Sequence, residues 1–414
     1  MPALGAWLLV AVYYFYQYAL RSAPSVMIPQ LTQAFGVSAL GVSTIMGMFY
    51  YGYSPFSLVA GAAIDRFGAR SVIPIGAALV SVGALLFGSG NLAAANLGRF
   101  LQGAGGAFAL VGAVYLVTKN FPASMAASFI GATQMFGMSG GSAGQFLVGP
   151  MLKHGLAWQQ FWLYAGILGL LIAISLFAFL PKQSRSQSPP SGGWSQLLVS
   201  LKSVFTNPQS ILCGLIAGLL FIPTTILGMT WGVQFLQQAR GREYDAAVML
   251  AATIPLGWII GCPLLGFISD RIGRRKPVIF GGAAVLFAAL IWVLFGNPEI
   301  LRGHAVGIIM GIASGAAMLP YTVIKETNPP QLGGTATGVI NFLNFTFSAL
   351  LGPVFGARLV RSPQDSDISA LEHYQAGFAP LIYGVVLALI LTFFLRETGP
   401  AKSRLRHTEA VVEN

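Results

Sequence analysis

Charged side chains are scarce in this sequence. They make up 8% of its 414 residues, and apolar side chains make up 55%, whereas an ordinary soluble domain has about 25% charged residues. A compact chain of this composition cannot cover itself with side chains that water solvates. The scarcity excludes a soluble globular protein and predicts a chain that lies in a lipid bilayer.

Acidic residues are missing from the places where a proton-driven carrier needs them. All 12 Asp and Glu, and all 4 His, fall in loops or near the ends of the long apolar runs. Proton coupling generally depends on a titratable group whose pKa is set by burial within the membrane. The sequence contains no obvious group of that kind.

Clusters of catalytic or metal-binding residues are also absent. The two cysteines, Cys213 and Cys262, lie in apolar runs without the spacing of metal ligands, so we interpret them as buried thiols. No nucleophile triad and no phosphate-binding loop is recognisable. We therefore expect neither a metal nor a cofactor, and the sequence argues against an enzyme.

What the sequence has instead is a series of apolar runs. Runs of about 20 residues can cross a hydrocarbon core of about 30 Å, and these lack the alternation of a barrel strand, so their backbone must bond to itself as helix. No Lys or Arg precedes the first run, which we expect to remain as a helix and not to be cleaved. We predict an all-α membrane protein with twelve transmembrane helices, near 5–34, 40–64, 71–90, 94–118, 125–149, 158–180, 209–236, 245–268, 277–296, 304–325, 334–357 and 375–395.

A short charged motif occurs twice. Residues 61–70 read GAAIDRFGAR and residues 266–275 read GFISDRIGRR, an offset of 205 residues at every matched position. A constant offset indicates an internal duplication. We expect an N-terminal six-helix bundle, a linker with a short amphipathic helix, a C-terminal six-helix bundle and a tail, at residues 1–181, 182–208, 209–396 and 397–414.

The repeated motif resembles the loop motif Gly-x-x-x-Asp-Arg-x-Gly-x-Arg of the major facilitator superfamily, which occurs in each six-helix half. The resemblance implies the major facilitator fold, with two pseudo-symmetric bundles that rock about a central cavity. In the family, the motif aspartate contacts the start of a helix in the opposite half, which would be near Gly334 and Thr335 for Asp65 and near Ser124 for Asp270. The candidate gating residues are Asp65, Arg66, Arg70, Asp270, Arg271 and Arg275.

Basic residues predict the orientation in the membrane. If the N terminus is cytoplasmic, 15 of the 23 Lys and Arg lie in cytoplasmic loops or the tail, six in outer loops and two inside helices. The positive-inside rule then places both termini in the cytoplasm. The net charge of +11 reflects this orientation, and no basic patch interleaved with aromatics supports nucleic-acid binding. We expect a monomeric, multi-pass protein of a bacterial inner membrane.

The first predicted helix carries an arginine near mid-bilayer. Tyr13, Gln17 and Arg21 have the spacing i, i+4, i+8 and so share one face of the helix. An unpaired arginine at this depth costs roughly 2.5–3.5 kcal/mol on insertion scales, so it must face protein or water. We interpret Arg21 as a binding residue; the alternative is a guanidinium held by backbone carbonyls of a neighbouring helix.

The fourth predicted helix carries a second arginine. Residues 98–106 read GRFLQGAGG, which resembles the superfamily's second motif, Arg-x-x-Gln-Gly-x-Gly. Arg99 and Gln102 then lie about one turn apart. In the family this arginine is either a coupling residue or a structural one, and both roles stay open.

The second half offers polar groups without charge. Ser and Thr in membrane helices usually bond to their own backbone, so the amides are the stronger candidates. The predicted cavity residues of this half are Trp231, Gln234, Tyr321, Asn341 and Asn344.

Two buried arginines without a buried carboxylate favour an anionic cargo. A guanidinium matches a carboxylate or phosphate at two points. We predict a secondary active or facilitative transporter, a uniporter, symporter or exchanger, for a carboxylate, phosphate ester, amino acid or short peptide. A proton carried on the substrate or an exchanged anion would accompany it.

Two alternatives stay open. A proton-driven drug or siderophore exporter would use the aromatic side chains Tyr13, Trp231, Trp258 and Phe345. The superfamily's antiporter motif places Gly-Pro near the middle of the fifth helix, however, and Gly149-Pro150 lies at its end. A membrane receptor that transports nothing is disfavoured because the loops are too short to form a domain.

Overall fold

The computed structural model describes residues 3–121, 123–181, 193–296, 304–360 and 370–399. The regular structure within these ranges is helical throughout. The helices of the first half are α1 (Ala3–Ser22), α2 (Ile28–Phe35), α3 (Ala39–Phe67), α4 (Ala69–Phe87), α5 (Leu92–Asn120), α6 (Ala123–Phe146), α7 (Val148–Lys153) and α8 (Trp158–Phe179).

The second half continues with a helix in the predicted linker and then repeats the bundle. Its helices are α9 (Gly193–Phe205), α10 (Pro208–Pro223), α11 (Gly232–Gln238), α12 (Tyr244–Ile272), α13 (Lys276–Phe295), α14 (Ala305–Ser314), α15 (Leu319–Glu326), α16 (Gly333–Val360) and α17 (Ala370–Phe394). Nine spans in the described part of the chain are long and apolar enough to cross a membrane. The helices α3, α6 and α16 have 29, 24 and 28 residues, which is also enough to cross a bilayer.

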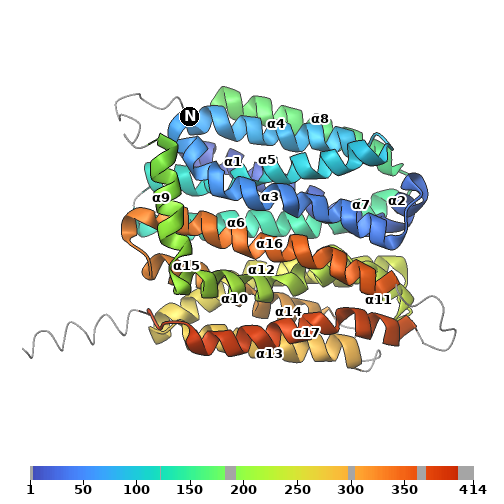
Figure 1. Ribbon diagram of the computed structural model, residues 1–414. Coiled ribbons are helices and arrows are strands. Elements are labelled where there is room, and N and C mark those ends of the chain that lie inside the picture. Colours follow the sequence, from blue (N-terminus) through green and yellow to red (C-terminus); the bar gives the residue numbers. More distant parts are fainter. Residues whose placement is uncertain (1–2, 122, 182–192, 297–303, 361–369, 400–414) are drawn as a thin grey trace, which may run out of the picture.

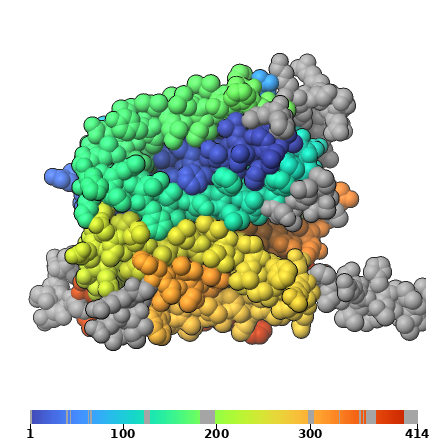
Figure 2. Space-filling model, turned by 180° about the vertical axis from the view of Figure 1, so that it is seen from behind, coloured from blue at the N-terminus to red at the C-terminus, as the bar shows by residue number. Residues whose placement is uncertain are grey.

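The two halves form two layers of helices. Figure 1 shows α1, α3, α4, α5, α6 and α8 above α10, α12, α13, α16 and α17, and Figure 2 shows the same division from behind. We call the end of the bundle where α1 begins and α9 lies the terminal end, and the end with α2, α7 and α11 the distal end. The layers meet where α3 packs along α16 and α6 packs along α12.

Hydrogen bonds cross between the halves along both of these contacts. The Ser54 hydroxyl donates to the carbonyl of Phe342 at 2.8 Å, and the Ser142 hydroxyl donates to the carbonyl of Ala252 at 3.0 Å. In both cases a small side chain on one half reaches the backbone of the other. The halves are therefore joined at specific positions, and a rocking motion must break or shift these bonds.

The distal end is closed by two further contacts between the halves. The Tyr244 hydroxyl donates to the carbonyl of Val26 at 2.9 Å, and Lys153 on α7 forms an ion pair with Asp245 on α12. The hydrogen bond to Asp245 raises the pKa of Lys153. The ion pair is half exposed, so water screens it and its contribution to closure is small.

Close helix packing in the first half depends on glycine. A Cβ added to Gly103 on α5 would lie 1.8 Å from the carbonyl oxygen of Phe49 on α3, and one added to Gly52 would lie 2.1 Å from the oxygen of Phe100. No side chain fits at either position. Small residues let membrane helices approach until their backbones touch, which fixes α3 firmly against α5.

Three of the predicted spans are interrupted helices. The first run divides into α1, a short turn over Ala23–Val26 and α2, because Pro24 and Pro29 have no N–H to continue the helix. In the seventh, α10 ends at Pro223 and a wide turn over Thr224–Gly228 separates it from α11. In the tenth, a tight turn over Gly315–Met318 separates α14 from α15. The last of these breaks contributes Ala317 and Met318 to the cavity described below.

The repeated motif forms an ion network in the second half. Arg275 bonds to Asp270 in the last turn of α12 and, at 3.0 Å, to Glu326 at the end of α15. Burial lowers the pKa of Arg275, but the hydrogen bonds to Glu326 and Asp270 outweigh it and raise that pKa overall. Asp270 is thus paired within its own half, and it is two-thirds exposed.

The other candidate gating residues are placed as follows. Arg271 is exposed, and the Arg70 guanidinium lies 5.6 Å from the ring centre of Phe177 on α8. The side chains of Asp65, Arg66 and Ser124 lie outside the described residues, and the contact expected between Asp65 and the start of α16 lies there with them.

Candidate functional site

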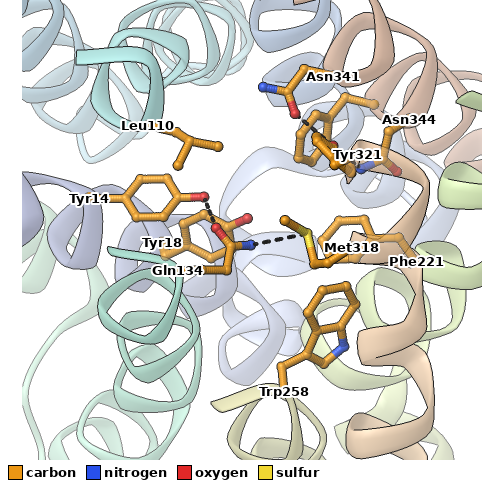
Figure 3. Close-up of a pocket in the computed structure, with 12 residues that line it drawn as sticks. Tyr14, Tyr18, Leu110, Gln134, Phe221, Trp258, Met318, Tyr321, Asn341 and Asn344 are labelled. Carbon is orange, nitrogen blue, oxygen red and sulfur yellow. Dashed lines mark hydrogen bonds between the residues drawn. The ribbon is translucent and has the colours of Figure 1, made fainter. Parts of the chain in front are cut away.

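A cavity lies between the two halves near the middle of the bundle (Figure 3). The water-accessible space in it is about 10 Å³, so the side chains of the two halves almost fill it in this conformation. The first half contributes Tyr14 and Tyr18 from α1 together with Gln134 from α6, which face the second half across the space. The residues facing them include Phe221, Trp258, Met318, Tyr321, Asn341, Asn344 and Phe345.

The face of α1 that meets the cavity differs by one position from the predicted face. Tyr14 and Tyr18 line the cavity with their rings 4.9 Å apart, and Arg21 follows on the same side. Tyr13 points into the first half instead, where its hydroxyl donates to the carbonyl of Gly105 at 2.7 Å. Gln17 is fully buried beside Gly106 of α5. Tyr14, Tyr18 and Arg21 have the spacing i, i+4, i+7, which places residues on one helix face as well as the predicted spacing i, i+4, i+8 does. Spacing alone therefore could not decide which face of α1 meets the cavity.

Arg21 is surrounded by rings from both halves. Its guanidinium carbon lies 4.9–5.6 Å from five ring centres, which we call the aromatic cage. The cage consists of Tyr18, Phe49 and Tyr50 of the first half and Phe221 and Phe345 of the second. Three of these rings, Tyr18, Phe221 and Phe345, also line the cavity, whereas Arg21 itself is not among its lining residues and lies behind them.

The hydrogen-bonding capacity of Arg21 is mostly unused. The side chain is 2% exposed, and Nε donates to the Tyr50 hydroxyl at 3.3 Å. Among the described residues, neither Nη1 nor Nη2 has a hydrogen-bond partner. Each cation–π contact contributes about 0.5–2 kcal/mol, so the cage offsets much of the cost of burying the charge. It leaves the two terminal nitrogens of the guanidinium buried without a hydrogen-bond partner in the described part of the chain.

Arg99 is equally buried and has a different environment. Its Nη1 donates to the carbonyl of Leu20 at 3.1 Å and to Gln102 Oε1 at 2.6 Å, and its Nη2 donates to the carbonyl of Arg21 at 3.4 Å. The last carbonyls of a helix have no partner within the helix. Arg99 therefore caps α1 at its end and, through the backbone of Arg21, holds that residue in place.

Tyr321 connects two amides of α16 in one hydrogen-bonded chain. Asn344 Nδ2 donates to the Tyr321 hydroxyl at 3.1 Å, and this hydroxyl donates to Asn341 Oδ1 at 2.7 Å. The direction of these bonds fixes which amide atom of Asn341 and of Asn344 points to the Tyr321 hydroxyl. It leaves Asn341 Nδ2 and Asn344 Oδ1 buried without a partner in the described part of the chain, and both residues line the cavity. All three belong to the predicted set, which the structure brings together here.

Two other predicted residues lie elsewhere. Trp231 is buried directly after the wide turn that ends α10, and Gln234 is partly buried one turn further along α11. Neither is among the residues that line the cavity. The wide turn carries this segment toward the distal end, which the sequence pattern did not reveal.

The sequence analysis missed Gln134. Its Oε1 accepts from the Tyr14 hydroxyl at 3.1 Å, and its Nε2 lies 4.0 Å from Met318 Sδ across the cavity (Figure 3). The sequence signal that could have identified Gln134 is the presence of a glutamine within a glycine-rich apolar run. The aromatic residues Trp258 and Phe345, expected for an exporter, also line this cavity.

Comparisons with known proteins identify the family. A model of the Major Facilitator Superfamily matches residues 10–353. The chain is 25% identical to the 4-hydroxybenzoate transporter PcaK of Pseudomonas putida, over 80% of each chain. It is also 25% identical to the hexuronate transporter of Bacillus subtilis (strain 168), over 82% of this chain and 84% of that one.

A solved structure agrees in fold. The bacterial homologue of the human lysosomal transporter Spinster, in an inward-facing and unoccupied conformation, superposes with a TM-score of 0.74 at 16% identity, over 95% of this chain and 96% of that one. The family and the helical membrane fold predicted from the sequence are thereby confirmed. The chain belongs to the major facilitator superfamily and is a multi-pass secondary transporter, not an enzyme.

Proposed function

We propose that this transporter carries a small organic anion and that Arg21 holds the anionic group. The observation that carries the proposal is the guanidinium itself, which is buried between the halves with both Nη atoms unpaired among the described residues. A buried charge is stable when it is paired, and a carboxylate or phosphate of the cargo would supply the pair. The relatives named for 4-hydroxybenzoate and hexuronate support an anionic cargo.

The position of Arg21 also fits alternating access. Three rings of the aromatic cage belong to the first half and two, Phe221 and Phe345, belong to the second. Rocking of the halves would separate these rings and expose Arg21 to one side of the membrane. We propose that an anion bound to Arg21 contacts both halves and so couples binding to their closure.

Arg99 and Gln102 act as positioning residues in this proposal. Arg99 donates to the backbone of Arg21, and Gln102 accepts from Arg99. The remaining predicted residues of α1, Tyr13 and Gln17, pack against α5 and would fix the rotation of the helix. The substrate itself would meet Arg21, Tyr18 and the residues of the second half.

Ligand-induced stabilisation of the purified protein tests the assignment. A ligand at 100 times its Kd stabilises the folded state by about 2.7 kcal/mol, and this holds whichever direction transport takes. Carboxylates, phosphate esters, amino acids and dipeptides would be screened on the wild type, on Arg21→Gln and on Arg358→Gln, whose arginine is exposed at the end of α16. We expect anions to raise the Tm of the wild type and Arg358→Gln but not of Arg21→Gln. Equal shifts in all three proteins would refute the role of Arg21.

A drug exporter is the second candidate, because the cavity also contains Trp258 and Phe345. Such a carrier would bind apolar cations and neutral molecules through its rings. Stabilisation by neutral or cationic aromatic compounds, retained in Arg21→Gln, would favour the exporter over the anion carrier.

Orientation and gating complete the proposal. We propose that both termini face the cytoplasm, so that the Lys153–Asp245 ion pair closes the outer side and the Arg275 network lies on the inner side. Cysteines introduced at exposed Leu198 of α9 and exposed Met151 of α7 would be labelled from opposite sides in intact cells. Labelling of Met151→Cys from the cytoplasm would show that the orientation is opposite to the proposed one.

A further inference from the structure

Trp258, which lines the cavity (Figure 3), begins a chain of hydrogen bonds that runs away from it. Its Nε1 donates to Thr224 Oγ1 at 2.8 Å, and the hydroxyl oxygens of Thr224 and Ser314 lie 2.9 Å apart. Ser314 donates its single proton to the carbonyl of Leu220 at 2.6 Å, so Thr224 must be the donor to Ser314. The chain therefore has one direction, from the indole through two hydroxyls to the backbone of α10.

The two hydroxyls of this chain belong to residues at which helices break. Thr224 is the first residue of the wide turn that follows α10. Ser314 is the last residue of α14, directly before the tight turn over Gly315–Met318. Both residues and Trp258 are buried, and buried polar groups are costly when they lose their partners. The chain thus holds both breaks and the indole ring together.

The other end of the wide turn contacts the first half of the protein. Gln145, fully buried in the last turn of α6, donates through Nε2 to the carbonyl of Gly228, the last residue of the turn. The next residue, Met229, lies against Gly141 of α6, where an added Cβ would be 2.9 Å from its Cε. Because α6 ends toward α7, these contacts lie on the distal side of the bundle (Figure 1).

We propose that the wide turn couples the cavity wall to the closure of the distal end, with Thr224 and Gln145 as its positioning residues. Thr224 ties the start of the turn to Trp258, and Gly228 ties its end to Gln145 of the other half. A displacement of the indole moves the turn and releases Gln145, and closure of the distal end returns the indole to its place. The inference goes beyond the proposed anion site, because no step of it involves Arg21.

A single cysteine at position 248 can report the opening of the distal end. Val248 of α12 is 2% exposed, and its Cγ1 would lie 3.1 Å from a Cβ on Gly149 of α7, so the other half covers it. The full-length protein would carry Val248→Cys together with Cys213→Ala and Cys262→Ala. Its rate of labelling by N-ethylmaleimide measures how often the distal end opens, and the measurement requires no cargo.

Single variants test each end of the turn. Thr224→Val keeps the shape of the side chain and breaks the chain, and we expect it to accelerate labelling about three- to tenfold. Gln145→Leu should have an effect of the same size. Thr224→Ser retains the hydroxyl and should label at the rate of the parent protein. So should the control Thr392→Val, whose buried hydroxyl donates to a carbonyl of its own helix.

The double variant distinguishes coupling from two independent contacts. If Thr224→Val and Gln145→Leu release the same turn, together they should accelerate labelling no more than the stronger single variant does. The effects of independent contacts multiply. We expect multiplication when Gln145→Leu is combined with Tyr244→Phe, which removes the separate bond to the carbonyl of Val26. Multiplication in the first pair, or parental labelling in Thr224→Val, would overturn the proposal.

Two further variants secure the test. If Thr224→Val does not fold, Ser314→Ala removes the acceptor of the same proton and takes its place in the double variant. Trp258→Phe keeps an aromatic wall without the indole N–H and should also accelerate labelling, whereas Trp292→Phe, at a position 43% exposed on α13, should not. A parental rate in Trp258→Phe would show that the cavity wall is not coupled to the turn and would overturn the proposal.

Discussion

The two buried arginines of the first half differ in what surrounds them. Arg99 is 1% exposed, lies over two rings and donates to two backbone carbonyls and a glutamine. Arg21 is 2% exposed, lies among five rings and, within the described residues, donates to one hydroxyl. Equal burial therefore does not mean an equal role. Within the described residues, Arg99 has only Nε without a partner, whereas Arg21 has both terminal nitrogens without one; we therefore propose a structural role for Arg99 and a binding role for Arg21.

Replacing Arg21 should have the largest effect on transport. Arg21→Lys keeps the charge but not the planar fork that bonds a carboxylate at two points. We expect uptake into proteoliposomes to fall about a hundredfold, a loss of about 2.7 kcal/mol, while the Tm stays within a few degrees. The control is Arg358→Lys, which replaces an exposed arginine and should leave uptake unchanged. Full uptake by Arg21→Lys would show that Arg21 and Arg99 do not differ in the way proposed.

Replacing Arg99 should act on stability first. Arg99→Met leaves the carbonyls of Leu20 and Arg21 buried without the donor that reaches them now, at a cost of about 1–3 kcal/mol for each group left unsatisfied. We expect a clear drop in Tm, measured by differential scanning fluorimetry in detergent. Arg21→Met serves as the matched comparison, because it removes a charge that is not bonded to backbone and should not lower the Tm. The contrast fails if Arg21→Met lowers the Tm as much as Arg99→Met.

Gln102 offers a milder test of the same cap. Gln102→Leu removes the acceptor at 2.6 Å from Arg99 but leaves the bonds from Arg99 to α1. A hydrogen bond to a charged group contributes about 1.5–3 kcal/mol, and part of it is regained if Arg99 turns fully to the carbonyls. We expect a smaller loss of Tm than in Arg99→Met, with anion affinity reduced only a few-fold. An effect on affinity as large as that of Arg21→Lys would show that Gln102 contacts the ligand.

Tyr50 should give the smallest change. Tyr50→Phe removes the hydroxyl that accepts from Arg21 Nε at 3.3 Å and keeps the ring of the cage. The long bond predicts a change in anion affinity of about threefold or less, measured by calorimetry. Tyr50→Leu, which also removes the ring, is the comparison and should weaken the positioning of Arg21 further. Loss of binding in Tyr50→Phe would mean that the hydroxyl, and not the cage, holds the guanidinium.

The sequence determined the family, the helical fold and the existence of Arg21 as a membrane-embedded cation. These follow from local properties: the length of the apolar runs, the charge within them and the repeated motif at residues 61–70 and 266–275. Tyr321, Asn341 and Asn344 could be predicted for the cavity too, because amides are costly in lipid unless they face protein or water. Gln134 on α6 obeys the same rule and could have been included.

Only the tertiary structure decided which face of α1 is turned to the cavity, and with it the roles of Tyr14 and Tyr18 against Tyr13 and Gln17. The helix rotation depends on contacts from α5, where the carbonyl of Gly105 binds Tyr13 and Arg99 caps the last turn. The displacement of Trp231 by the wide turn over Thr224–Gly228 is likewise a product of packing. Which donors of a buried arginine remain unused depends on atoms that are far apart in the chain, so local pattern determined where the charge lies and packing determined what it can bind.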